Sequence, residues 1–181
     1  RGVVRGEDLG IALALVVVLV ATGAPTTAVD WYNARDLENR RMGPGFLWTV
    51  PYLDDQQAGF AWIRQATSRE AIVQADPVVR GRQNWSDIPS FTGRRMIGGN
   101  GLPLLRDHHA IRAERIHELI TRMPPEQAHA EARALGIDYL WIDQWDLDAP
   151  TGPAVQRLLN RPELFPPMFG SGKTAVLAVA K

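Results

Sequence analysis

The chain has 181 residues, of which 45% are hydrophobic and 22% are charged, and its 20 basic and 20 acidic residues give a formal net charge of zero. This balance argues against the broad positive surface of a nucleic-acid-binding protein, so no nucleic-acid partner is expected. The absence of cysteine excludes structural disulfides, cysteine-ligated zinc sites and thiol nucleophiles.

An apolar run from Leu9 to Val29 contains no charged residue. At 1.5 Å of rise per residue, a helix of this length measures roughly 30 Å, the thickness of the hydrocarbon core of a bilayer. The run therefore predicts an N-terminal transmembrane helix over residues 1–32 with its flanks, the span itself covering about 9–29. Trp31 and Tyr32 follow the run, where amphipathic rings favour the membrane interface. The lipid bilayer is the expected partner.

Two other interpretations of this run stay open. Arg1 and Arg5, an apolar core and the small residues 22–24 also fit the outline of a secretory signal peptide. A buried helix of a soluble core is the second alternative. Basic residues on both sides of the run leave its orientation undecided. Because the chain begins with arginine, we expect it to be the C-terminal piece of a longer protein.

After the run, residues 33–53 are predicted to be a juxtamembrane linker that contains Gly43-Pro44-Gly45. Residues 54–181 are predicted to form one soluble α/β domain. Its first half is expected to hold a helix from Asp54 or Asp55 to about Thr67, a strand over 71–75, a loop over 78–91 with room for one helical turn, and a strand over 92–99.

The second half of this domain is expected to contain helices over 104–123 and 125–134, and then Gly136 and a buried strand over 137–143. An order of helix, glycine and buried strand is typical of a parallel α/β unit. A helix over 153–160 and two strands, 165–169 and 174–180, complete the chain. The predicted fold is an α/β sandwich with a mixed sheet and a C-terminal β-hairpin.

Two motifs that suggest cofactors fail on their context. The segment 170–174 resembles the end of a phosphate-binding loop, but Pro167 stands where the motif needs glycine and a strand is expected where it needs a helix. The four histidines show neither the spacing of three or four residues nor the H-E-x-x-H pattern of helical metal sites. We therefore predict no metal and no cofactor.

A basic cluster is the best candidate for ligand binding, and it consists of Arg80, Arg82, Trp85, Arg94 and Arg95. Guanidinium groups make forked contacts with phosphate or carboxylate, and a tryptophan face can stack on a sugar ring. These residues are predicted to hold an anionic or glycan ligand. The alternative is structural: the arginines pair with carboxylates such as Asp76, Asp87 or Asp107 and fasten a loop to the sheet.

A second group follows the buried strand, where α/β proteins tend to place ligands: Asp143, Asp146 and Asp148 with Trp141 and Trp145. Carboxylates in this position can act as acids, bases or metal ligands. They more often cap the helix or turn that follows, and no partner spacing marks them as catalytic.

Several segments together resemble the C-terminal region of uncharacterised multi-spanning bacterial membrane proteins, which are similar to the GT-C class of membrane glycosyltransferases. The segments that carry the resemblance are the last apolar run, Gly43-Pro44-Gly45-Phe46, Ala61-Trp62-Ile63-Arg64, Pro77-Val78-Val79-Arg80, Phe91-Thr92-Gly93-Arg94-Arg95 and Leu135-Gly136-Ile137-Asp138-Tyr139-Leu140. They cover essentially the whole chain.

The resemblance implies an α/β domain on the extracytoplasmic face of the bacterial inner membrane and a lipid-phosphate-linked sugar or glycan as a partner. In that class the catalytic carboxylate lies in the first external loop, far upstream of this segment, so no catalytic residue is expected here. The expected function is an accessory one, in acceptor binding or packing. The alternatives are a non-enzymatic, membrane-tethered binding or scaffold domain, or a secreted α/β domain released by signal cleavage.

Overall fold

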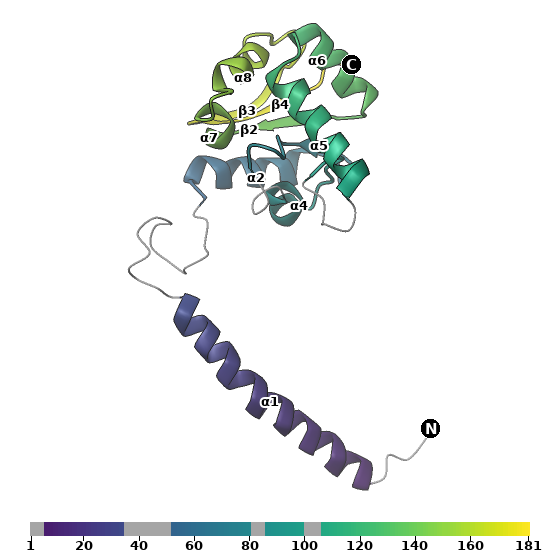
Figure 1. The fold of residues 1–181 in the computed structure, drawn as a ribbon, viewed down its shortest axis with the longest axis vertical. Coiled ribbons are helices and arrows are strands. Elements are labelled where there is room, and N and C mark those ends of the chain that lie inside the picture. The colour runs from purple at the N-terminus through teal and green to yellow at the C-terminus, as the bar shows by residue number, and fades with distance from the viewer. Residues whose placement is uncertain (1–5, 35–51, 81–85, 100–105) are drawn as a thin grey trace. The chain divides into compact units, whose positions relative to one another are not determined.

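The computed structural model describes residues 6–34, 52–80, 86–99 and 106–181 (Figure 1). The chain divides into two compact units, Arg1–Tyr52 and Leu53–Lys181. The first unit contains helix α1 (Gly6–Ala34), and the second contains all the other helices and strands named below. Most of the linker predicted over 33–53 lies outside the described residues.

Helix α1 forms over the predicted apolar run and exposes its apolar side chains. The large apolar side chains that are more than half exposed are Ile11, Leu13, Leu15, Val16, Val17, Val18, Leu19 and Val20. Among the described residues, however, no helix combines the length and the apolarity that crossing a membrane requires. The transmembrane helix predicted over 9–29 is therefore not supported. The unbroken apolar block ends at Ala21, and Thr22, Gly23, Pro25 and Thr27 follow it within the same helix.

Within the described part of the second unit, the sheet has four strands in the order β1-β2-β4-β3. They are β1 (Val73–Gln74), β2 (Tyr139–Ile142), β3 (Pro167–Ser171) and β4 (Thr174–Ala178). β1 and β2 are parallel, whereas β4 is antiparallel to both β2 and β3. These pairings confirm the predicted mixed sheet, its parallel α/β unit and the C-terminal hairpin.

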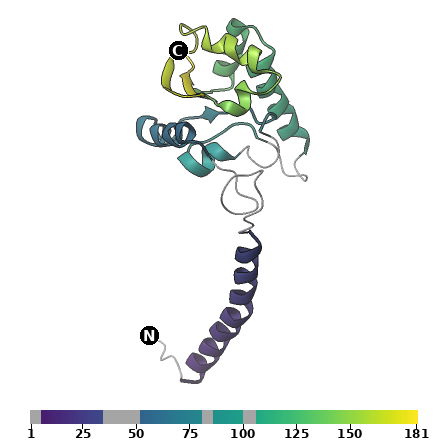
Figure 2. The same ribbon diagram turned by 90° about the vertical axis from the view of Figure 1, so that its left-hand side faces the viewer.

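Helices cover both faces of this sheet, as Figures 1 and 2 show. Helices α2 (Asp54–Ala66) and α4 (Asp87–Thr92) lie on one face, and α5 (Arg106–Thr121), α6 (Pro125–Ala134) and α8 (Gly152–Leu159) lie on the other. A short helix, α7 (Gln144–Leu147), follows β2 directly. The second unit is thus a sandwich in which a mixed sheet separates two helical layers.

The alternation of side chains along β2 divides the core between these two layers. Leu140 and Ile142 belong to one large hydrophobic cluster with α5, α6 and α8. The other buried members of that cluster are Ile116, Leu119, Ile120, Ala128, Ala132, Ile137, Val155, Leu158, Phe165, Leu177 and Val179. The apolar face predicted for the helix over 104–123 is therefore buried in its second half, whereas Ile111 remains 68% exposed.

The intervening residues of β2, Tyr139 and Trp141, pack against the opposite layer. Phe60 of α2 stacks on Trp141, with ring centroids 4.6 Å apart and planes 8° apart, and Phe91 stacks on Phe60 at 5.1 Å. The helix approaches so closely because residue 59 is glycine: a Cβ atom there would lie 2.7 Å from the Trp141 ring. The missing side chain at Gly59 thus lets α2 pack closely against the sheet.

Two short segments differ from the prediction. The strand expected over 92–99 makes only a single bridge, between Arg95 and Ile72. Gly93 ends α4 with a φ of 68°, and the side-chain Oε1 of Gln74 accepts hydrogen bonds from the backbone of Ile97 and Gly98 in place of a strand ladder. Helix α7 was not predicted, since four residues are too few to show helical periodicity.

The close approach at residue 59 predicts the effect of one added methyl group. Gly59→Ala forces the Trp141 ring to shift, so we expect overpacking to lower the free energy of unfolding by roughly 1–3 kcal/mol. Gly170→Ala is the matched control, because a Cβ atom at residue 170 meets nothing within 4 Å. Urea unfolding of both variants measures the difference, and equal stabilities would contradict the packing described for α2.

Candidate functional site

Polar side chains gather where the parallel strands β1 and β2 end, which is the edge at which α/β sheets usually bind ligands. After β1, Asp76 Oδ1 accepts hydrogen bonds from the backbone of Val78 and Val79 at 2.9 and 3.3 Å, which fixes a turn. After β2, Asp143 accepts a hydrogen bond from the backbone of Trp145 at 2.9 Å and caps α7. Two aspartates therefore shape the loops at this edge.

Arg80 joins the two loops through a buried ion-pair cluster. Its Nη1 and Nη2 atoms donate to the two carboxylate oxygens of Asp146 at 2.8 and 2.7 Å, a forked arrangement. Nη2 also lies 2.8 Å from Asp143 Oδ1, and all three side chains are at most 2% exposed. Arg80 Nε, which is also buried, has no hydrogen-bond partner. One guanidinium group thus serves two carboxylates, and the cluster carries a net negative charge when all three groups are ionised.

The cluster extends to elements on both sides of the sheet. Asp143 Oδ2 accepts hydrogen bonds from the indole Nε1 of Trp141 at 2.8 Å and from Gln56 Nε2 of α2 at 3.1 Å. Asp76 contacts His117 of α5, with 2.8 Å between Oδ2 and Nδ1. The carbonyl oxygen of Asp76 accepts a hydrogen bond from Arg80 at 3.2 Å. Side chains from α2, β2 and α5 therefore meet the loops at this edge.

Burial changes the ionisation of the cluster. It raises the pKa of Asp146 to about 6, because desolvation outweighs the attraction of Arg80. Desolvation alone would lower the pKa of Arg80, but the charges of Asp146 and Asp143 raise it above its usual value. Asp146 therefore takes up a proton as the solution becomes mildly acidic.

The three described residues of the predicted basic cluster, Arg80, Arg94 and Arg95, have different surroundings in the fold. Arg80 is buried beyond the end of β1, whereas Arg95 bridges to Ile72 before β1 begins. The exposed Arg95 donates a hydrogen bond to the carbonyl oxygen of Glu70 at 2.9 Å. Arg82 and Trp85 lie outside the described residues. A ligand held jointly by these five residues stays a prediction, and the described contacts do not bring Arg80 and Arg95 together.

Arg94 is buried and is used to close the C-terminal end of α2. Its Nη2 atom donates to the carbonyl oxygens of Arg64 and Thr67 at 2.8 and 2.9 Å, and its Nε atom donates to Thr67 Oγ1 at 2.9 Å. Its Nη1 atom donates to the carbonyl oxygen of Thr92 at 3.1 Å. These contacts match the structural alternative of fastening loops. The partners of Arg94, however, are backbone carbonyl oxygens and one hydroxyl group, and the carboxylates that pair with Arg80 are those of Asp143 and Asp146.

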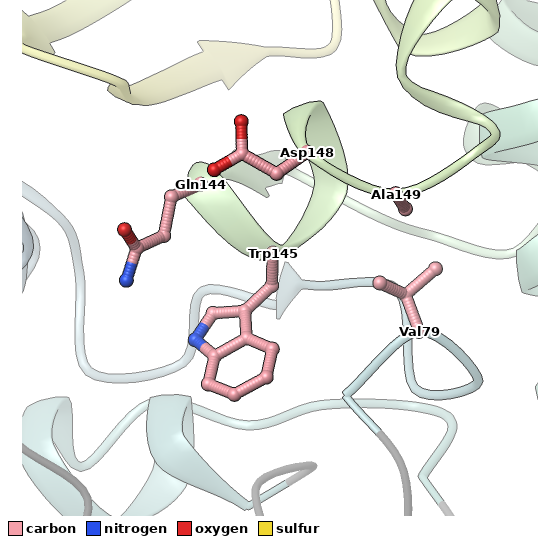
Figure 3. Close-up of a pocket in the computed structure, with 5 residues that line it drawn as sticks. All are labelled: Val79, Gln144, Trp145, Asp148 and Ala149. Atoms are coloured by element: carbon pink, nitrogen blue, oxygen red, sulfur yellow. The ribbon is translucent and has the colours of Figure 1, made fainter. Parts of the chain in front are cut away.

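A pocket of about 400 Å³ opens beside α7 and is lined by Val79, Gln144, Trp145, Asp148 and Ala149 (Figure 3). Trp145 and Asp148 belong to the second group singled out in the sequence, whereas Gln144 and Val79 were missed. At its margin, both oxygens of Asp148 accept from Lys173 Nζ, at 2.6 and 2.8 Å. Figure 3 shows the indole and the Gln144 amide projecting from the same short helix. This pocket is therefore a candidate site near the carboxyl edge of the sheet.

The motifs that suggest cofactors have other contacts. Segment 170–174 forms the β3–β4 turn with Gly172 at a φ of 54°, and β4 follows where a phosphate-binding loop would need a helix. His129 Nε2 lies 2.8 Å from the carbonyl oxygen of Ala180. In the parts of the chain that the structure describes, no group of three or more metal-binding side chains is arranged to hold an ion.

No protein-family model matches this chain, and no curated protein matches it significantly.

The ion-pair cluster predicts a large effect of removing the guanidinium group of Arg80. Arg80→Ala leaves two buried carboxylates without a counter-charge, so we expect the free energy of unfolding to fall by roughly 3–5 kcal/mol. Arg122→Ala is the control, because its ion pairs with Glu114 and Glu118 are exposed and should contribute little. Chemical denaturation of the two variants measures both effects. Similar small losses would contradict the structural role of Arg80.

The raised pKa of Asp146 predicts a pH dependence of stability. Because the folded-state pKa lies above the unfolded value, the stabilising contribution of this group is complete below about pH 4 and is lost as the pH rises through about 6. We expect the free energy of unfolding to change with a more positive slope between these pH values in Asp146→Asn than in the natural chain. Urea unfolding at a series of pH values measures the slopes, and identical slopes would refute the shift.

Proposed function

We propose that this chain is a membrane-attached accessory domain of a multi-spanning, glycosyltransferase-like bacterial membrane protein. In this proposal α1 contacts the lipid bilayer, and the α/β unit lies on the extracytoplasmic face of the inner membrane. The α/β unit has a role in acceptor binding or packing and supplies no catalytic residue.

The observation that carries the proposal is the exposed apolar surface of α1. The six consecutive residues from Leu15 to Val20 are all apolar and all more than half exposed. Successive residues of a helix are rotated by about 100°, so six of them cover every side of the helix. A helix at the surface of a soluble protein has an apolar stripe, whereas one that is apolar on all sides needs apolar surroundings. The acyl chains of lipids provide such surroundings, and in this proposal only residues 15–20 contact them.

The α/β unit offers no comparable surface among its described residues. Its large exposed hydrophobic side chains belong to five separate segments and are Leu53, Val78, Phe91, Ile111 and Met168. Single exposed apolar residues are normal on soluble proteins and need no membrane to cover them. We therefore assign lipid contact to α1 and the accessory role to the α/β unit.

The accessory role also agrees with what the family-like segments do in the fold. Residues 61–64 lie in α2, where Arg94 closes the end of the helix. Residues 77–80 carry Arg80, and residues 135–140 lead from α6 into β2. Each of these three segments helps to connect neighbouring helices, strands or loops. Such a structural role suits a packing or binding domain better than a catalytic one.

Lipid contact by α1 predicts the result of adding charge to its apolar block. In the double variant Val17→Asp, Leu19→Asp, each aspartate costs roughly 3 kcal/mol in a membrane-inserted helix, so the two together should lower partitioning by about ten-thousandfold. The measurement is flotation of the full chain with vesicles of phosphatidylethanolamine and phosphatidylglycerol. The natural chain should float with the vesicles, and the double variant should remain in the dense fraction.

Ile111→Asp is the matched control, since Ile111 is as exposed as the residues of the block but lies on α5. This variant should float as the natural chain does. Equal flotation of the double variant and the natural chain would overturn the lipid contact of α1. In spheroplasts that make the natural protein, digestion of the α/β unit by external protease supports the extracytoplasmic placement, and protection refutes it.

A further inference from the structure

The pocket beside α7 presents polar groups that the fold does not use. Neither the side-chain amide of Gln144 nor the indole Nε1 of Trp145 makes a hydrogen bond to any part of the chain that the structure describes, and both side chains are half-buried in the pocket wall. Trp141, by contrast, donates its indole N–H to Asp143. Polar groups that line a pocket and lack partners in the protein are suited to bind a ligand.

The short helix that carries these groups is held in place from beneath. Asp143 caps the start of α7, and Asp146 Oδ2 accepts a hydrogen bond from the backbone of Asp143 at 2.9 Å. The forked ion pair between Asp146 and Arg80 anchors the buried side of the helix. Gln144 and Trp145 therefore project from a rigid support, and binding costs little ordering of the backbone.

The charge and surface of the pocket narrow the class of ligand. Asp148 is balanced by Lys173, so the wall has no excess charge to attract an anion or a cation. Val79, Ala149 and the Trp145 ring offer apolar surface, whereas the Gln144 amide and the Asp148 carboxylate offer hydrogen bonds. A fully apolar ligand would leave the Gln144 amide without a partner. The pocket favours a neutral ligand with both C–H faces and hydroxyl groups.

We propose that this pocket binds a neutral saccharide. The sugar ring packs its C–H face on the indole of Trp145, and its hydroxyl groups exchange hydrogen bonds with the Gln144 amide and the Asp148 carboxylate. The volume of about 400 Å³ lies within the usual range of small-molecule sites. This assignment deepens the proposed function and rests on its acceptor-binding role, since it names the class of molecule that the accessory domain holds.

Saturation-transfer NMR on the full chain tests the proposal, with maltotriose, cellotriose and triacetylchitotriose as probes and adenosine as a non-saccharide comparison. The chain is kept in a zwitterionic detergent, because detergents with sugar headgroups would compete for the pocket. At least one trisaccharide should bind to the natural chain. Trp145→Ala should weaken that binding by roughly tenfold or more, whereas Trp145→Phe should retain most of it because an aromatic face remains.

Trp62→Phe is the matched control, because Trp62 contacts Tyr139 and Phe169 and does not line the pocket. It should bind the trisaccharide as the natural chain does, and near-ultraviolet circular dichroism establishes that each variant is folded. The proposal is overturned if no trisaccharide binds, if folded Trp145→Ala binds unchanged, or if adenosine alone binds in a manner that depends on Trp145.

The double aspartate variant of α1 separates this result from the membrane proposal. If it loses flotation and keeps trisaccharide binding, both proposals are supported. If the natural chain binds sugar but never floats, the saccharide site stands and the membrane attachment fails. If the natural chain floats but binds no sugar, the saccharide site fails and the lipid contact of α1 stands.

Discussion

The ion pairs of Arg80 with Asp143 and Asp146 are the interaction on which the rest of the α/β unit depends. They are formed at the carboxyl edge of the sheet, between the loop after β1 and the short helix after β2. Burying three ionisable groups has a large desolvation cost, and only good geometry repays it. The cluster meets this condition with a forked pair and with further hydrogen bonds to Asp143 from Trp141 and Gln56. The main effect of the cluster is to fix both loops relative to the two helical layers.

That fixed position links the core to the candidate site. Leu140 and Ile142 of β2 pack against the helices on one face of the sheet, and Trp141 packs against α2 on the other. The end of β2 is therefore held from both sides. Helix α7 begins at this point. Its Asp146 faces inward and forms the ion pair with Arg80. Residues on the other sides of the same helical turn remain open to the pocket. The side of the helical turn on which a residue of α7 lies thus decides whether its side chain holds the fold together or can contact a ligand in the pocket.

Much of this fold could be predicted because its signals are local. The uncharged run of β2, the glycine before it and the hairpin near the C-terminus appear directly in the sequence. The partners of Arg80 could not be predicted in this way, since 66 residues separate it from Asp146 and nearby aspartates are equally plausible by sequence. The contacts of Arg94 with carbonyl oxygens leave no residue-type signal at all. The capping spacing of Asp143 and Asp146 was present in the sequence, but a four-residue helix has no periodicity to support it. In α1 the uncharged run has the length of a membrane span, but polar and small residues begin at Thr22 and interrupt its apolar character.

The first turn of α2 connects Leu53, the first residue of the α/β unit, to the buried ion-pair cluster. The backbone N–H of Leu53 donates to Gln56 Oε1 at 2.9 Å, and Gln56 Nε2 donates to Asp143 at 3.1 Å. Asp55 accepts a hydrogen bond from the backbone of Lys173 in the β3–β4 turn. Tension applied to the chain at Leu53 would therefore act, through side chains of the first turn of α2, on the ion-pair cluster and on the hairpin turn.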